Sequence, residues 1–157
     1  VMFSMYWPTS PVPGIWLATS LEAYEDTEAV VANAIVDGQV VEWDAPSGCD
    51  SGVALQSDSG TERFLYCSLD DVEVEPGDAV EAGDRIGARV RYDADGNEVY
   101  EPRDDDELFG FGFSMQARED EDDSWVALCS ENLLWELVED EADRPATVSV
   151  ASGVCAT

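Results

Sequence analysis

Residues 72–92 read VEVEPGDAVEAGDRIGARVRY, and this stretch says more about the fold than any other. Apolar and polar residues alternate through it, a pattern typical of short β-strands with one buried face. The triplets Pro76-Gly77-Asp78 and Ala82-Gly83-Asp84 interrupt the alternation with residues that favour tight turns. The stretch therefore predicts short strands and tight turns in a compact β-sandwich.

Segments on either side of this stretch also indicate β-structure. Residues 30–43, VVANAIVDGQVVEW, predict a first hairpin that turns at Asp37-Gly38. Gly52–Gln56 and Arg63–Leu69 predict a second hairpin, joined through Asp58-Ser59-Gly60. Further along the chain we expect a hairpin at 93–100, a strand at 107–119, a strand followed by a short helix at Glu131–Val138, and a final strand in 146–157.

The whole chain is predicted to be all-β. We expect a barrel-sandwich hybrid, a duplicated hybrid-motif β-sandwich of short antiparallel strands. Residues 1–18 contain Pro8, Pro11 and Pro13 among aromatic residues and predict an extended N-terminal arm that packs on the domain. Residues 19–157 then form a single β domain, a size that can bury its own core.

Charge is the strongest feature of the composition. The chain has 36 acidic residues, seven basic residues that are all Arg, and a net charge of -29. Concentrated salt would screen the resulting repulsion, so we interpret the surface as halophilic. Genomic replacement of Lys by Arg and a calcium-collecting role are the competing interpretations. Nucleic acid is disfavoured as a direct partner, because no basic stripe is present to neutralise phosphates.

Four cysteines are candidates for disulfides, and none lies in a spacing typical of zinc sites. One or two bridges would indicate an exported or virion-exposed protein. Four buried thiols are the alternative. The candidates are Cys49, Cys67, Cys129 and Cys155.

We expect the beginning of this sequence to be neither a membrane span nor a signal peptide. No apolar run is long enough to cross a bilayer, and residues 1–14 lack the basic and apolar regions of a secretory signal. Their aromatic character instead predicts a contact surface for another subunit, since such side chains are costly to leave in water. The interface candidates are Phe3, Met5, Tyr6 and Trp7.

Taken in order, these segments resemble the lysostaphin-type zinc endopeptidases, β-sandwich enzymes that cut peptide cross-links of bacterial cell walls. The most specific motif of that family, V-x-x-G-D-x-V-x-x-G-D-x-I-G, is matched by residues 74–87. Weaker matches are the aromatic-Trp-Pro opening at 6–8, the strand pair at 31–40, Y-x-H-L at 66–69 and the final H-L-H-F-E strand at 112–116. The resemblance covers about residues 6–118.

The resemblance implies a zinc ion held by two His and one Asp, with a further His beside it. Ser68 stands at the His of Y-x-H-L, and Gly112 and Ser114 stand at the final His pair. The first ligand motif would fall within Thr19–Tyr24. The chain has no histidine, and neither Ser nor Gly is a zinc ligand in such a site. These three residues are therefore vestigial positions of a degenerate peptidase.

Other side chains of this sequence would not restore the zinc site of that family. Even if Glu22 or Cys67 approached it, two or three ligands of the right kind would be lacking. Ser and Cys nucleophiles have no His or Lys to activate them. We therefore expect no catalytic residue, no metal, no cofactor and no enzymatic activity.

Two further motifs could suggest a different function. The repeated Gly-Asp turns also occur in biotinyl and lipoyl carrier domains, but a carrier needs a lysine, which this chain lacks. Asp93, Asp95 and Asn97 resemble part of a calcium loop. Their spacing does not fit an EF-hand, so a hairpin turn is the preferred interpretation.

These observations lead to a functional expectation. The chain is predicted to be a non-catalytic structural or assembly protein, extracellular or on a virion, in a halophilic setting. Its partners would be other protein subunits. The alternative is a secreted module that binds a cell-wall polymer or a protein through the old substrate groove.

Overall fold

The computed structural model describes residues 2–4, 15–18, 28–45, 49, 51–99, 109–118 and 124–128. Every regular element of these residues is a β-strand, as the alternating sequence predicts. The strands are β1 (Met2–Ser4), β2 (Ile15–Ala18), β3 (Ala29–Asn33), β4 (Gly38–Val41), β5 (Gly52–Ser57), β6 (Glu62–Cys67), β7 (Asp71–Val72), β8 (Ala79–Val80), β9 (Arg85–Val90), β10 (Gly110–Arg118) and β11 (Trp125–Leu128).

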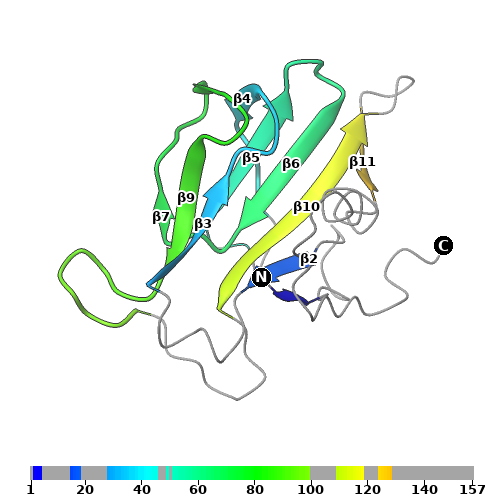
Figure 1. Ribbon diagram of the computed structural model, residues 1–157. Coiled ribbons are helices and arrows are strands. Elements are labelled where there is room, and N and C mark those ends of the chain that lie inside the picture. Colours follow the sequence, from blue (N-terminus) through cyan, green and yellow to red (C-terminus); the bar gives the residue numbers. More distant parts are fainter. Residues whose placement is uncertain are drawn as a thin grey trace, which may run out of the picture.

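The described strands form two antiparallel sheets. The large sheet has the order β1-β2-β10-β6-β5-β4-β8, with β11 beside β10, and the small sheet has the order β3-β9-β7. Figure 1 shows the long strands β6 and β10 side by side, with β3 and β9 to one side of them. This architecture confirms the predicted all-β fold. The described residues include no helix suited to crossing a membrane.

The core lies between the two sheets and is rich in aromatic side chains. Tyr66 on β6 packs edge-on against Phe113 on β10, with ring centroids 5.3 Å apart, and Phe64 stacks on Phe113 at 6.2 Å. Each fully buried apolar side chain contributes about 1.5–3 kcal/mol. The main buried cluster is Ala32, Ala34, Val40, Val53, Leu55, Phe64, Tyr66, Leu69, Val80, Ile86, Phe111 and Phe113.

Tyr66 also links the two layers through its hydroxyl. The Tyr66 hydroxyl donates to the carbonyl oxygen of Asn33 at 3.1 Å and accepts from the N–H of Ile35 at 3.2 Å. Burial raises the pKa of this phenol, so the hydroxyl stays protonated and keeps its donor. The large sheet is thus tied to the chain segment that follows β3.

The two Gly-Asp turns have the same geometry. In the first, the N–H of Asp78 donates to the carbonyl of Glu75, and the Asp78 carboxylate accepts from the N–H of Glu75. The turn at 81–84 repeats both bonds six residues later. Gly77 and Gly83 have φ values of 105° and 95°, which glycine adopts without steric cost. The repeated sequence motif therefore encodes a repeated turn, as predicted.

Both turns hold one segment of chain, residues 34–40. At one end, Val40 exchanges backbone hydrogen bonds with Gly77 and Asp78. At the other end, Ala34 exchanges the equivalent bonds with Gly83 and Asp84. The spacing of six residues is the same on both strands of this contact. The same pair of hydrogen bonds is thus repeated at both ends of the contact, as the repeated sequence motif suggests.

The predicted first hairpin at Asp37-Gly38 is wrong. β3 pairs with β9 in the small sheet, whereas β4 pairs with β5 and β8 in the large one, so the chain crosses between sheets at this point. Gly38 is needed for close approach instead, because a Cβ there would clash with the carbonyl oxygen of Gln56. Taken locally, Asp37-Gly38 favours a two-residue hairpin turn. The hydrogen bonds that residues 34–40 make with the two Gly-Asp turns determine the path of the chain instead.

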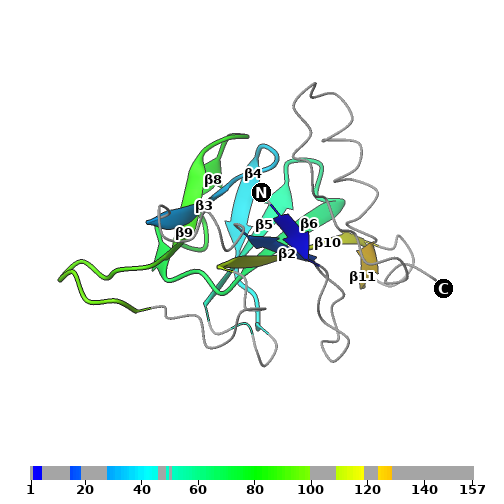
Figure 2. The ribbon, with the colours of Figure 1, turned by 60° about the horizontal axis from the view of Figure 1, so that its bottom comes forward.

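Other predicted elements agree with the structure. β5 and β6 form the predicted second hairpin, and β10 is the predicted strand with Phe109, Phe111 and Phe113 all buried. Tyr92 pairs with Glu98 in the predicted hairpin, which projects from the sheets in Figures 1 and 2. Within residues 1–18, β1 pairs with β2, which pairs with β10. The predicted helix at Glu131–Val138 and the strand in 146–157 lie outside the described residues.

Candidate functional site on the outer face of the large sheet

The large sheet has two faces with different chemistry. Residues of β5, β6 and β10 alternate between them, so those next to the core aromatics point to the opposite side. We call this opposite side the outer face. Directly paired residues share a face, which places Gly52, Cys67 and Gly112 in one row and Ala54, Leu65 and Ser114 in the next.

The three vestigial positions come together at one end of the outer face. Gly112 pairs directly with Cys67, Ser114 lies two residues further along β10, and Ser68 follows Cys67 in the chain. Gly112 contributes no side chain, and Ser114 is 7% exposed. Thr19–Tyr24, where the resemblance places the first ligand motif, lies outside the described residues, as does Glu22.

Ser68 has an unusual backbone conformation. Its φ is 63°, in the left-handed region that costs a residue with a side chain roughly 1–2 kcal/mol. This conformation ends β6 at Cys67, two residues earlier than the sequence predicts. The carbonyl of Ser68 accepts a hydrogen bond from the Arg89 Nη1 at 3.2 Å, and Arg89 also pairs with Asp70. These contacts hold the turn beside the vestigial positions.

A disulfide occupies the outer face next to Gly112. Of the four candidate cysteines, Cys49 and Cys67 form this bridge, and Cys129 and Cys155 lie outside the described residues. The bridge covers Gly52, where an added Cβ would lie 2.8 Å from the Cys49 sulfur and 2.6 Å from the Trp43 ring. Because Cys67 is oxidised, it supplies no thiolate to a metal.

A row of polar side chains crosses the outer face further along the strands. Gln39, Gln56, Arg63 and Gln116 are directly paired across β4, β5, β6 and β10, and we call them the polar row. Gln116 lies four residues beyond Gly112 and two beyond Ser114 on β10, so the polar row is about 13 Å from Gly112 and about 7 Å from Ser114. These residues are far apart in the chain, and their grouping was not predicted from the sequence.

Arg63 is the only charged member of the polar row. Its Nε and Nη2 donate to Gln116 Oε1 at 3.0 and 2.7 Å. Its guanidinium carbon lies 4.6 Å from the ring centroid of Trp125 on β11, a cation–π contact. Burial lowers the pKa of Arg63, but an arginine of this kind stays charged. The row therefore presents one fixed positive charge.

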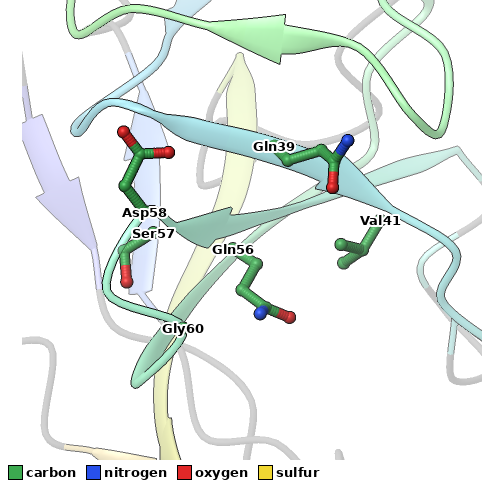
Figure 3. Close-up of a pocket in the computed structure, with 6 residues that line it drawn as sticks. All are labelled: Gln39, Val41, Gln56, Ser57, Asp58 and Gly60. Carbon is green, nitrogen blue, oxygen red and sulfur yellow. The ribbon is translucent and has the colours of Figure 1, made fainter.

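A pocket of about 180 Å³ opens beside the polar row. Figure 3 shows Gln39 and Val41 from β4, Gln56 and Ser57 from β5, and Asp58 and Gly60 from the turn after β5. The Gln39 side chain donates to the carbonyl of Gly77 at 3.1 Å. The pocket has room for several waters or for one side chain.

The turn after β5 also holds a cluster of hydroxyl groups. The hydroxyls of Ser57, Ser59 and Thr61 each donate to Glu62 Oε2, at 2.8, 2.7 and 2.8 Å. Hydrogen bonds from Ser59, and then from Thr61 and Ser57, lower the pKa of Glu62. The cluster explains the sharp turn at the rim of the pocket and suggests no reaction.

The calcium candidates form a hairpin turn. Asp93 Oδ1 accepts from the N–H groups of Asp95 and Asn97 at 2.9 and 2.8 Å, and Asn97 Nδ2 donates to both Asp93 oxygens. These bonds, with the Asn97 side chain first, lower the pKa of Asp93. Within the described ranges, no three His, Cys, Asp or Glu side chains are placed to hold a metal.

The interface candidates are only partly covered by the structure. Phe3 lies in β1, where its backbone pairs with Leu17. Met5, Tyr6 and Trp7 lie outside the described residues. The contact surface predicted for these four residues stays a prediction.

Comparison with known proteins identifies the fold. The catalytic domain of lysostaphin from Staphylococcus simulans superposes with a TM-score of 0.55 at 19% identity, over 84% of this chain and 87% of that domain. Whole lysostaphin gives a TM-score of 0.58 at 19% identity over 96% of this chain, which spans 57% of its length. No protein-family model matches the sequence, and no curated protein matches it either.

This similarity confirms the resemblance seen in the motifs. At such low identity it shows the fold alone, so the chain has the fold of a lysostaphin-type peptidase domain. The chemistry of this chain has to be argued from its own residues.

Proposed function

We propose that this chain is a non-catalytic protein with a structural or assembly role, built on a peptidase-like β domain. The observation that carries the proposal is the chemistry at the vestigial positions. Ser68, Gly112 and Ser114 come together there, beside a cysteine already used in a disulfide. The chain has no histidine to hold or activate a metal-bound water.

The proposed setting is extracellular or on a virion, at high salt. A net charge of -29 favours a medium that screens repulsion over distances of a few ångströms. The Cys49–Cys67 bridge fits an oxidising compartment. Other protein subunits are the proposed partners, and neither nucleic acid nor a cofactor is part of the proposal.

A secreted binding module is the second candidate. The pocket beside the polar row favours this role, because the pocket lies on the same face of the sheet as the vestigial positions. In that role the chain would bind a cell-wall polymer or a protein as a monomer.

Sedimentation of the purified chain in molar and in dilute KCl tests the structural role. We expect a defined oligomer in molar salt, and dissociation or unfolding in dilute salt as repulsion grows. A monomer at every salt concentration would contradict the structural role and favour the binding module. Cleavage of short peptides that depends on added zinc and stops with a chelator would contradict both roles.

A further inference from the structure

Among the described residues, Arg63 differs from Arg85, Arg89 and Arg91 in having no acidic partner. Arg85 pairs with Asp71 and Glu73, Arg89 with Asp70, and Arg91 with Glu98. Arg63 makes no ion pair with any carboxylate of the described residues and bonds to a neutral amide instead. With 36 acidic residues in the chain, a half-buried arginine without one is unexpected.

The guanidinium of Arg63 is held in a fixed orientation. Gln116 Oε1 accepts hydrogen bonds from two nitrogens of the guanidinium, Nε and Nη2, and the Trp125 ring centroid lies 4.6 Å from its central carbon. The remaining nitrogen, Nη1, makes no hydrogen bond with a described residue. A cation that has lost part of its hydration gains most from a partner of opposite charge. Arg63 is therefore preorganised for a carboxylate from another molecule.

The pocket beside Arg63 supplies the second half of the site. Gln56 lines the pocket and pairs directly with Arg63, so their Cβ atoms are about 5 Å apart. Val41 gives the pocket its one apolar side chain, whereas Asp58 places a carboxylate at its edge, and the Gln56 amide makes no hydrogen bond with a described residue. The volume is below the several hundred Å³ typical of cofactor sites. The pocket has room for one side chain, which can pack on Val41 beside an amide that can bond a peptide group.

We propose that the outer face binds an extended acidic peptide at this point. A Glu or Asp carboxylate of the peptide pairs with Arg63, and an apolar side chain two residues away enters the pocket. Residues i and i+2 of an extended peptide share a face about 7 Å apart, and neighbouring strands lie about 4.8 Å apart, so a peptide that crosses the strands reaches from Arg63 on β6 to the pocket over β5 and β4. This proposal rests on the proposed function, because it specifies what the protein partner presents, an extended acidic segment. It does not depend on whether the chain has lost catalysis.

Salt should affect this site in an unusual direction. The net charge of -29 repels an acidic peptide over long distances, whereas the contact with Arg63 is short. Molar salt shortens the Debye length to about 3 Å and removes the repulsion before it removes the contact. Affinity should therefore rise from dilute to molar KCl, opposite to a simple ion pair.

Titration with two matched peptides tests the proposal. The probes are acetylated, amidated peptides containing Leu-Gly-Glu or Leu-Gly-Gln, added in molar KCl to the full chain with ¹⁵N-labelled arginine. We expect only the Glu peptide to shift the Arg63 Nε–H resonance. Arg63→Gln should weaken its binding roughly ten- to a hundredfold, the loss expected for a charge-assisted hydrogen bond.

Two further variants and one further ligand complete the test. Arg63→Lys keeps the charge without the planar fork and should recover part of the affinity, and Arg85→Gln, at an exposed paired arginine, should leave it unchanged. A near-ultraviolet circular dichroism spectrum checks that each variant is folded. Equal binding of both peptides, or binding of neither, would overturn the proposal. So would an acidic oligosaccharide that needs Arg63 when the peptides do not bind.

The outcome is separable from the proposed function. Zinc-dependent cleavage would contradict the loss of catalysis and leave the Arg63 site standing. Failure of the peptide to bind would remove the site while the chain could still be a non-catalytic structural protein.

Discussion

The two faces of the large sheet belong to the same strands but serve different purposes. On the inner face, Phe64, Tyr66 and Phe113 interlock and bind the small sheet. On the outer face, Gly112 contributes no side chain, Ser114 contributes a small hydroxyl, and the Cys49–Cys67 bridge lies beside Gly112. Because side chains alternate along a strand, residues of the outer face point away from the aromatic core, although Ala54, Leu65 and Ser114 are buried there too.

The sharpest test of this division compares neighbours on β10. Phe113→Ala should lower the free energy of unfolding by about 3–5 kcal/mol, since it opens a cavity among packed rings. Ser114→Ala, one residue further and on the outer face, should cost less than about 1 kcal/mol. Urea unfolding in molar KCl measures both. Equal losses would show that the outer face carries as much of the stability as the core.

Removing the disulfide should have the next largest effect. Cys49 and Cys67 are 18 residues apart, and a loop of this size contributes about 3 kcal/mol by restricting the unfolded chain. The double variant Cys49→Ala/Cys67→Ala should unfold at lower urea concentration. Its near-ultraviolet circular dichroism spectrum in native buffer, which reports the packing of the core aromatic side chains, should be unchanged. Loss of the native near-ultraviolet spectrum would mean that the bridge also holds the inner face together.

Tyr66→Phe should produce a smaller loss on the inner face. The variant keeps the ring packing but leaves the Asn33 carbonyl and the Ile35 N–H without their partner. We expect a decrease of about 1–3 kcal/mol in the free energy of unfolding. Faster amide exchange confined to Ile35 and its neighbours would locate the effect. An unchanged stability would show that water replaces the hydroxyl at no cost.

Relief of backbone strain gives the smallest expected change, and its sign is opposite. Ser68→Gly should raise the free energy of unfolding by about 1 kcal/mol, because glycine adopts a φ of 63° without steric cost. Ser68→Val, the matched control, should lower it. A loss of stability in Ser68→Gly would indicate that the Ser68 side chain holds the turn.

Much of the scaffold could be predicted because its signals are local. The Gly-Asp turns each close within four residues, and the second hairpin needs only the Asp58-Ser59-Gly60 turn between alternating strands. The path of residues 34–40 could not be predicted in this way. It is fixed by hydrogen bonds of Val40 and Ala34 to turns 37 to 50 residues away in the chain.

The candidate site was harder to predict for the same reason. Arg63 and Gln116 are 53 residues apart, and only the pairing of β6 with β10 brings them together. The alternation of apolar and polar residues shows that Arg63 and Gln116 each point away from the core. It does not show that they lie side by side on neighbouring strands. The pairing of Cys49 with Cys67 likewise needs the fold, since four cysteines allow three connectivities.

The zinc content of the native chain decides whether the vestigial positions have lost their metal. The protein, purified without chelator and dialysed against zinc in molar KCl, is analysed for bound metal, with the Ser68→His/Gly112→His/Ser114→His variant beside it. We predict far less than one zinc per chain in the native protein and more in the variant, whose imidazoles are zinc ligands. One tightly bound zinc per native chain, lost when Ser68 or Ser114 is changed to Ala, would contradict a non-catalytic role.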